Sequence, residues 1–402
     1  MGLSATESAV LDRIDPALLL ARTEAWAAVN SGSRNLDGLA TVAGLLADSF
    51  APLPGAVALV DPAPVTAMDP EGREVDLPHG RHLTVTVRPH APLQLLLTGH
   101  MDTVFGADHP FQSLRWIEAG VLNGPGVTDM KGGIAIMLAA LEAIEASPVA
   151  NSIGYQLMIN SDEETGSLAS AALIAELARG KAAALTYEPA LPDGTLAGAR
   201  GGTGNFSIRV TGRSAHAGRN PEDGRNALTA AADIALRLEA LGGEDLTVNP
   251  ARIDGGGPNN VVPDHAVLRV NFRPRSSAAI ARTAAAIDRI LGEVAAERGV
   301  DCHRHGGFTR PPKPIDAGAE LLFALVGAAG ADLGLAIGRR DTGGVCDGNN
   351  IAALGVPVVD TMGARGGAIH SADEYLIVDS LAERARLSAL TMLRLAESGL
   401  KA

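Results

Sequence analysis

The sequence is poor in cysteine, in aromatic side chains and in positive charge. Its two cysteines, Cys302 and Cys346, cannot form a disulfide framework, which is typical of a reducing compartment. Aromatic residues make up 3% of the 402 residues, too few for a platform that stacks bases or sugars. Lys and Arg total 33 against 46 Asp and Glu, so the net charge is −13. That balance argues against binding to nucleic acids or anionic membranes, because both need a basic face.

The sequence also lacks a recognisable secretory signal and a long apolar run. Its first residues, MGLSATESAVLDRID, contain no basic segment followed by an apolar stretch. Every apolar stretch is short and interrupted by Gly, Pro or charge. The hydrophobic fraction of 46% is nevertheless enough to bury a sizeable core. We therefore expect a soluble, cytoplasmic protein with no nucleic-acid partner and no membrane partner.

Helical and strand-like patterns alternate along the first 200 residues. Apolar residues at helical spacing predict helices at 16–30, 36–50, 131–146 and 167–178. Short apolar runs predict strands at 56–60, 83–87, 94–98, 154–160 and 183–187. The run at 94–98 lies between Pro and Gly, the pattern of a strand that is buried on both faces. The alternation predicts an α/β domain around a mostly parallel sheet.

The pattern changes near residue 200. The order of elements becomes strand, helix, strand, strand, helix, strand, and it predicts a ferredoxin-like α+β domain with one exposed sheet face. Helix and strand alternation resumes after the proline-rich segment at 310–314. We therefore divide the chain into the first part of a larger domain, an inserted domain and the second part of the larger domain, at 1–202, 203–312 and 313–402. Hinges are expected near 200–203 and 310–314.

An imidazole and a carboxylate follow the predicted strand at 94–98. His100 and Asp102 stand in the segment GHMDT. Alternate residues of an extended segment point the same way, so both can face the crevice at the carboxyl end of the sheet. Asp102 is also placed to fix the tautomer of His100 if that imidazole binds a metal. Taken alone, the pair favours an ordinary solvated loop.

Further acids and a second histidine also lie at the ends of predicted elements. Asp129 precedes the predicted helix at 131–146, Glu163 and Glu164 follow a strand, Glu188 follows another, and His370 comes after an apolar run. Singly, each has an ordinary explanation as a helix cap, a dipole partner or a turn residue. Together they provide two imidazoles and three carboxylates for a pair of zinc-like ions, namely His100, Asp129, Glu164, Glu188 and His370.

A set of motifs gives the chain a family resemblance. The pieces GHMDTVFG, GPGVTDMKGGIA, NSDEETGS, TYEP, GRSAHAG, NNVVP and AIHSADEY, in that order, resemble the dinuclear-zinc aminoacylase and carboxypeptidase family. Its members include glutamate carboxypeptidase, acetylornithine deacetylase and succinyl-diaminopimelate desuccinylase. The resemblance covers nearly the whole chain. It implies a zinc-peptidase-like catalytic domain interrupted by a lid and dimerisation domain.

The resemblance also implies the arrangement of the ligands. Asp129 would bridge two divalent ions, which are zinc or, as alternatives, cobalt or manganese. His100 and Glu188 would complete one metal site, and Glu164 and His370 the other.

Two further acids receive catalytic roles from the resemblance. Asp102 would orient the metal ligand His100. Glu163 would be the general base for a hydroxide that bridges the ions, and would pass the proton to the leaving nitrogen.

The residues expected to bind substrate carry weaker signals. Arg310 is chosen for the substrate carboxylate, because a guanidinium grips a carboxylate with two hydrogen bonds. Asn260 and Arg273 match family positions, although Asn271 replaces an acid that is common two residues before that arginine. The family's histidine at His216 reaches the cleft of a second subunit, which implies a homodimer through the inserted domain. Singly, these residues are also typical of turns and solvated strand ends.

These predictions converge on a metal-dependent hydrolase. We expect it to cleave an amide bond and release a carboxyl-terminal amino acid from an N-acyl amino acid or small peptide. A glutamate-carboxypeptidase-like enzyme and an N-acyl amino acid deacylase remain open. Rivals are an aminopeptidase and a catalytically inactive binding protein. Glu163 argues against the last, because a binding protein has no need of a base. Cys346 has no base beside it in the sequence, and is expected to be a buried structural residue.

Overall fold

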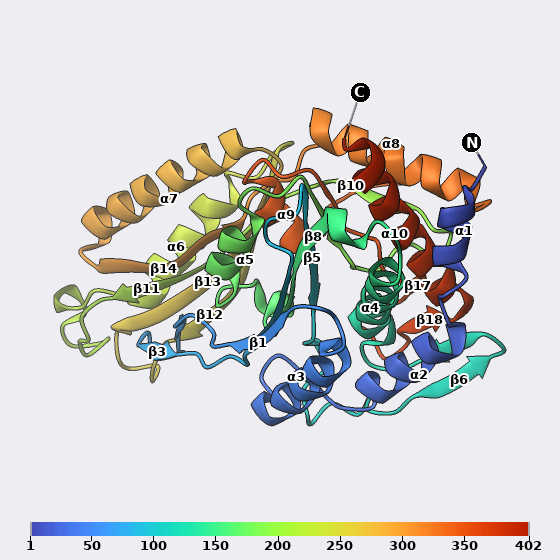
Figure 1. Cartoon of the computed structure of the whole chain (residues 1–402). Coiled ribbons are helices and arrows are strands. Elements are labelled where there is room, and N and C mark those ends of the chain that lie inside the picture. The colour runs from blue at the N-terminus through green and yellow to red at the C-terminus, as the bar shows by residue number, and fades with distance from the viewer. Residues whose placement is uncertain (1, 401–402) are drawn as a thin grey trace.

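The computed structural model describes residues 2–400. Figure 1 shows a larger domain that contains both ends of the chain and a slender inserted domain beside it. Among the described residues, no helix combines the length and the apolar character needed to cross a bilayer. A cytoplasmic location stays a prediction.

A six-stranded sheet forms the centre of the larger domain. Its strands, in order across the sheet, are β1 (Ala56–Val60), β4 (His82–Val87), β8 (Ile153–Asn160), β5 (Leu93–His100), β9 (Ala183–Thr186) and β16 (Val358–Val359). The pairings β8–β5, β5–β9 and β9–β16 are parallel, whereas β4 pairs antiparallel with both of its neighbours. The expected mostly parallel sheet is therefore confirmed, and its reversed strand is β4.

Helices cover both faces of this sheet. One face shares a core with α1 (Ala5–Leu11), α2 (Pro16–Ala27), α3 (Leu36–Phe50), α4 (Gly132–Glu145), α8 (Ala317–Asp332) and α10 (Asp379–Ser398). The other face packs against α5 (Ala171–Ala178) and α9 (Asp347–Ala352). Figure 1 shows these two layers on either side of β5 and β8. The carboxyl ends of the parallel strands are thereby left free to carry a site.

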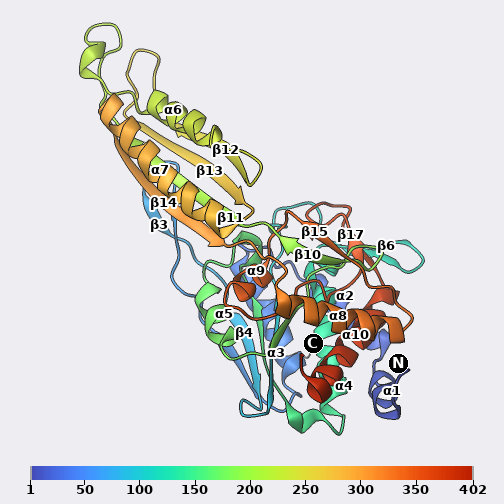
Figure 2. The same ribbon diagram turned by 90° about the horizontal axis from the view of Figure 1, so that it is seen from above.

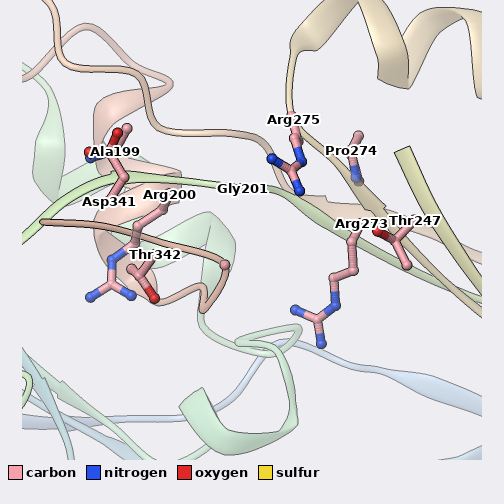
Figure 3. A pocket seen from close by; sticks show the side chains of 10 residues that line it. Ala199, Arg200, Gly201, Thr247, Arg273, Pro274, Arg275, Asp341 and Thr342 are labelled. Carbon is pink, nitrogen blue, oxygen red and sulfur yellow. The ribbon is translucent and has the colours of Figure 1, made fainter. Parts of the chain in front are cut away.

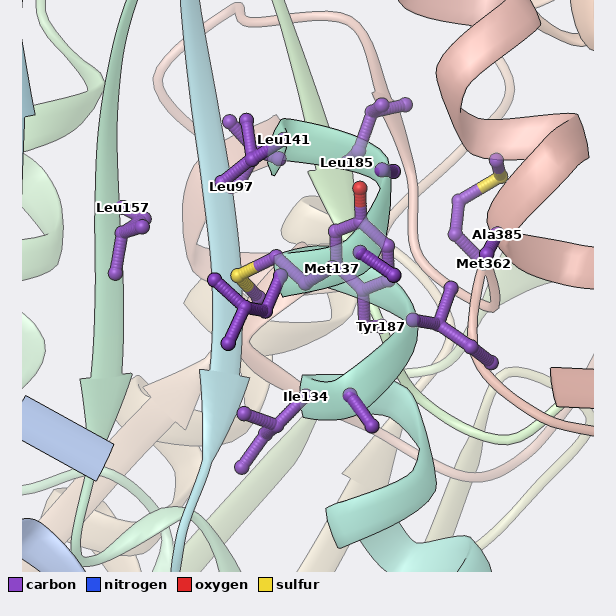
Figure 4. Close-up of a cluster of buried hydrophobic side chains, with 14 of the residues drawn as sticks. Leu97, Ile134, Met137, Leu141, Leu157, Leu185, Tyr187, Met362 and Ala385 are labelled. Atoms are coloured by element: carbon purple, nitrogen blue, oxygen red, sulfur yellow. The ribbon is translucent and has the colours of Figure 1, made fainter. Parts of the chain in front are cut away.

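The central helix α4 is apolar around nearly its whole circumference, because it lies between the sheet and α10. Figure 4 shows Ile134, Met137 and Leu141 of α4 against Leu97 and Leu185 of the sheet. All five side chains are fully buried. Burial of side chains of this size contributes about 1.5–3 kcal/mol each to folding, so this layer fixes the helix that follows Asp129.

Three small sheets complete the larger domain. Their strands are β2 (Thr66–Met68) with β3 (Glu74–Asp76); β10 (Leu196–Arg200) with β15 (Arg339–Thr342); and β17 (Gly366–Gly367), β18 (Tyr375–Ile377), β7 (Val121–Asn123) and β6 (Arg115–Glu118).

The inserted segment folds into one antiparallel sheet with two helices. Its elements are β11 (Thr203–Thr211), α6 (Ala227–Glu239), β12 (Leu246–Gly255), β13 (His265–Pro274), α7 (Ser277–Arg298) and β14 (Asp301–Arg310). The sheet order is β12-β13-β11-β14, as in a ferredoxin-like domain. Ser276 caps α7 by accepting a hydrogen bond from the Ala279 N–H, and Gly299, with φ +63°, ends it. Both helices pack on one face of the sheet around a separate core.

The opposite face of this sheet was expected to be exposed, but the β2–β3 hairpin of the larger domain lies on part of it. His303 Nε2 is 2.8 Å from Glu74 Oε1, and Arg269 donates a hydrogen bond of 3.0 Å to the Met68 carbonyl. Figure 2 shows β3 beside β14. The prediction missed this contact because it joins segments far apart in the sequence.

The two segments that join the domains run side by side. Arg200 and Lys313 exchange backbone hydrogen bonds of 2.9 and 3.0 Å. Beneath them, the fully buried Asp360 accepts from Arg200 Nε at 2.7 Å and lies 2.8 Å from Lys313 Nζ. One carboxylate thus ties both connecting segments to the central sheet. The division of the chain near residues 203 and 312 remains a prediction, as do hinges at these segments.

Candidate metal centre and active site

The candidate site lies at the carboxyl ends of the parallel strands. His100 is the last residue of β5, Glu163 and Glu164 lie in the short turn η3 (Glu163–Thr165) after β8, and Glu188 comes two residues after β9. Asp129 lies in the turn η1 (Val127–Lys131) that leads into α4. Parallel strands bring these segments together although they are distant in sequence.

The two carboxylate oxygens of Asp129 face two different histidines. Asp129 Oδ1 is 3.1 Å from His100 Nε2, and Asp129 Oδ2 is 3.3 Å from His370 Nε2. Glu188 Oε2 lies 3.7 Å from His100 Nε2, and Glu164 Oε2 lies 3.2 Å from His370 Nε2. The five predicted ligands therefore form two groups that share Asp129, the pattern expected for two ions bridged by one carboxylate.

Asp102 contacts both His100 and the turn that carries Glu163 and Glu164. The His100 Nδ1 is 3.0 Å from the Asp102 carbonyl oxygen, and donation from Nδ1–H would leave Nε2 facing Asp129. The Asp102 carboxylate accepts hydrogen bonds of 3.2 Å from the backbone N–H groups of Glu163 and Glu164. It also accepts one of 2.7 Å from the Ser33 hydroxyl. The hydrogen bond to His100 therefore comes from the Asp102 backbone carbonyl, while the Asp102 side chain positions the acidic turn.

Glu374 holds the loop that carries Asp129. Its carboxylate accepts hydrogen bonds from the backbone N–H groups of Gly126, Thr128 and Asp129 at 3.0–3.1 Å. Burial, followed by the negative charge of Asp129, raises the pKa of Glu374 to about 7. A cation held at Asp129 would offset that repulsion.

Glu163 is buried beside an arginine. Arg310 Nη2 lies 2.7 Å from Glu163 Oε1, and it donates hydrogen bonds of 2.8 Å to the Glu163 carbonyl and the Ser167 hydroxyl. Burial raises the pKa of Glu163 well above its usual range, while the Arg310 charge opposes the rise. Arg310 is 4% exposed. In this conformation the guanidinium chosen for a substrate carboxylate is occupied by the candidate base.

The electrostatics of the cluster fit divalent cations. Burial raises the pKa values of Glu164 and Glu188, because the carboxylates lose water and repel their acidic neighbours. Hydrogen bonds to Asp129 and Glu164 raise the pKa of His370 to about 10. Oε1 of Glu188 is buried and has no hydrogen-bond partner in residues 2–400. Bound cations would replace the protons on the imidazoles and give this oxygen a partner.

The donor atoms also gather in two overlapping groups of three, of which one includes Glu163 and neither contains His370. One potential ligand atom from each of His100, Asp129 and Glu164 lies within 4.8 Å of the other two, and the same holds for His100, Glu163 and Glu188. A cavity of about 500 Å³ opens over these groups. It is large enough for a small peptide or acyl amino acid.

The remaining predicted residues lie on the inserted domain and are exposed. The His216 and Asn260 segments meet, since the Ala217 N–H donates a 2.9 Å hydrogen bond to the Asn260 carbonyl. Neither side chain lines the cavity over the candidate metal centre. Arg273 lines a neighbouring cavity, which is shown in Figure 3. The structure therefore brings the five ligands, Asp102, Glu163 and Arg310 together, and leaves these three residues apart from them.

The family follows from comparison with known proteins. The model of peptidase family M20/M25/M40 matches residues 96–394. The chain belongs to this family. It is therefore a hydrolytic enzyme, and M20 peptidases use a dinuclear metal site.

Individual relatives of this M20 peptidase agree with the assignment to the family. It is 29% identical over 323 residues to carboxypeptidase G2 of Pseudomonas sp. (strain RS-16), covering 77% of this chain and 76% of the relative. It is 28% identical over 308 residues to succinyl-diaminopimelate desuccinylase of Verminephrobacter eiseniae, covering 71% and 75%. The structure of a tripeptidase from Staphylococcus aureus superimposes with a TM-score of 0.73 at 24% identity, covering 96% and 100%. That likeness shows the fold.

Three supporting residues of this M20 peptidase escaped the sequence analysis. Ser33 gave no local signal, since a serine in a loop is common, and Glu374 was not singled out although it stands within the quoted motif AIHSADEY. Lys131 stands directly after the GVTDM segment. Its ammonium is buried and donates hydrogen bonds of 2.6 Å to the Ser31 hydroxyl and 2.7 Å to the Met101 carbonyl. For Lys131, as for Glu374, its place within a quoted motif was the one available signal.

Proposed function

We propose that this M20 family chain hydrolyses an amide bond and releases a carboxyl-terminal amino acid from an N-acyl amino acid or small peptide. The observation that carries the proposal is that Asp129 directs one oxygen to His100 and the other to His370. A bridging carboxylate between two imidazoles, with Glu163 beside it, supplies the parts for hydrolysis assisted by two metals.

The five ligands would hold two divalent ions, zinc or alternatively cobalt or manganese. When bound, the ions would lower the pKa of a coordinated water and polarise the scissile carbonyl. Glu163 takes the proton of the attacking water and delivers it to the leaving nitrogen. Asp102 holds Glu163 in place through the backbone N–H of that residue. Arg310 keeps the Glu163 carboxylate oriented until substrate enters.

The substrate class draws on the relatives. One is named a carboxypeptidase and another a desuccinylase, at nearly equal identity. The first name describes release of a carboxyl-terminal residue and the second describes removal of a succinyl group, so an N-acyl amino acid deacylase is the second candidate function. Asn260 and Arg273 would help hold the substrate when the domains close.

A homodimer is part of the proposal. His216 is exposed on the inserted domain and does not line the cavity over the metal centre. We therefore assign it to the cleft of a second copy, where its imidazole would donate a hydrogen bond to the oxyanion.

A substrate screen tests the proposed function. The metal-loaded enzyme is incubated with N-acyl amino acids, N-blocked dipeptides and N-free dipeptides, and the liberated amine is measured. We expect release from N-blocked substrates, with loss of activity after chelation and recovery after zinc addition. Hydrolysis of N-free substrates alone would identify an aminopeptidase. Metal binding without any turnover would identify a binding protein.

A further inference from the structure

A second cavity of about 530 Å³ adjoins the one over the metal centre. The two cavities share Arg200, Asp341, Thr342 and Gly343 as lining residues. Beyond this shared wall, the second cavity is lined by residues of the inserted domain, namely Thr247, Arg273, Pro274 and Arg275. A substrate whose reacting carbonyl lies at the metals can therefore extend between the domains.

Arginines reach this cavity from both domains. Figure 3 shows Arg200 and Asp341 on one side, and Arg273 and Arg275 on the other. Asp341 is the one carboxylate in the lining, and its Oδ1 already accepts a 2.8 Å hydrogen bond from the Ala199 N–H. Arg200 is paired with the buried Asp360. Arg273 and Arg275 against Asp341 therefore leave this cavity with positive charge in a chain of net charge −13.

The arginines of the inserted domain keep their donors free for a ligand. The Arg275 side chain has no hydrogen bond and no ion pair with any residue in 2–400. Arg273 uses its Nε alone, in a 2.8 Å bond to Asn271 Oδ1. Arg200 is already engaged by Asp360, so Arg273 and Arg275 are the groups that a ligand would meet. Single exposed arginines are ordinary, but two aimed at one interdomain cavity repel each other unless an anion joins them.

We propose that this cavity binds a second carboxylate of the substrate, remote from the scissile bond, and that Arg275 with Arg273 selects for it. The planar guanidinium matches a carboxylate with two parallel hydrogen bonds, and the positive cavity raises the local concentration of anions. This inference rests on the proposed hydrolase function. The second carboxylate belongs either to the acyl group or to the side chain of the released amino acid.

Two matched substrate pairs distinguish these sources. The acyl arm compares N-succinylleucine with N-butyrylleucine, and the side-chain arm compares N-acetylglutamate with N-acetylglutamine. For wild type we expect a higher kcat/KM for the doubly charged member of one pair. Arg275→Ala should lower that kcat/KM about tenfold through KM, because a hydrogen bond between charged groups is lost. Hydrolysis of the singly charged partners, N-butyrylleucine and N-acetylglutamine, should change by less than about twofold.

Two further variants act as controls. Arg275→Lys should retain part of the preference, because the charge stays and the two-pronged geometry is lost. Arg179→Ala removes an exposed arginine that follows α5 and lines neither cavity, and should leave both pairs unchanged. Equal kcat/KM for the members of both pairs in wild type would overturn the proposal. So would an Arg275→Ala enzyme with undiminished preference.

Calorimetry separates this inference from the proposed function. Binding of N-succinylleucine and N-acetylglutamate to the metal-loaded Glu163→Gln enzyme, with and without the additional Arg275→Ala change, reports on the cavity without turnover. About tenfold weaker binding of one compound to the double variant supports the cavity even if neither compound is hydrolysed by wild type. Absence of hydrolysis by wild type overturns the proposed function, whereas equal binding to both proteins overturns the carboxylate site.

Discussion

Arg310 Nη2 and Glu163 Oε1 are 2.7 Å apart, and the two side chains are 5% and 9% exposed. Arg310 ends β14, where the chain returns to the larger domain, and Glu163 follows β8. The end of the inserted domain is therefore in direct contact with the candidate base. A movement of the inserted domain that shifts Arg310 would change the electrostatic environment of Glu163.

The first prediction concerns the charge of Arg310. Arg310→Met removes a cation that lowers the pKa of Glu163, so that pKa rises further. A base with a higher pKa is deprotonated only at higher pH, so the acidic limb of the kcat/KM profile should move to higher pH. Arg310→Lys should move it less. Arg304→Met, which removes an exposed cation from the same strand, is the control. An unmoved limb in Arg310→Met would contradict the coupling.

The second prediction concerns the proton acceptor. Glu163→Gln keeps the size of the side chain and removes the base, so kcat should fall by about 10²–10⁴-fold. The metal content should remain that of wild type, because the five assigned ligands are intact. Steady-state kinetics and elemental analysis of the same sample measure both. Glu176→Gln, an exposed acid on α5, should leave both unchanged. Full activity in Glu163→Gln would remove this residue from the mechanism.

The third prediction separates the two metal sites. Asp129 faces both histidines, whereas His370 faces Glu164 and Asp129 alone. Asp129→Asn should therefore lose both ions, because each site loses a charged ligand. His370→Ala should lose one ion and keep the other. Elemental analysis after gel filtration gives the stoichiometry, with His90→Ala, an exposed histidine, as the control. Two ions retained by Asp129→Asn would contradict the bridge.

The sequence was sufficient to predict where a site residue lies when a local pattern, such as the end of a strand, determines its position. His100 ends a buried strand and Glu188 follows another, and parallel strands bring their carboxyl ends to one edge. The split of the ligands into two groups about Asp129 was taken from the family resemblance, and in the structure the two Asp129 oxygens face His100 and His370 separately.

The sequence was insufficient to predict a contact between two residues when that contact depends on how the two domains pack against each other. Arg310 and Glu163 are separated by 147 positions, and no periodicity relates them. The docking of Glu74 on His303 depends in the same way on the relative placement of two domains. Arg275 was not singled out, because an exposed arginine after a strand looks the same in a sequence whether it faces solvent or a cavity.

The fourth prediction concerns the carboxylate beneath the connecting segments. Asp360→Asn removes the counter-charge of Arg200 and Lys313, whose side chains are 9% and 2% exposed. Two buried cations left without their counter-charge should lower the free energy of unfolding by about 3–5 kcal/mol. Urea denaturation measures this loss. Glu320→Gln breaks the exposed pair with Arg339 and should cost less than about 1 kcal/mol. Equal stabilities of the two variants would show that Asp360 does not secure these segments.

The last prediction tests whether His216 acts in a second copy of the chain. His216→Ala and Glu163→Gln should each be inactive as homodimers, because one lacks the oxyanion donor and the other the base. In a mixed dimer, the His216→Ala subunit keeps Glu163 and receives an intact His216 from the other chain. After random exchange, half of the dimers are mixed and each has one working site, so activity should recover to about a quarter of wild type. The two variants are denatured together, refolded and assayed, with separately refolded samples as controls. If His216 acted within its own chain, no mixture would regain activity, since every site would lack one of the two groups.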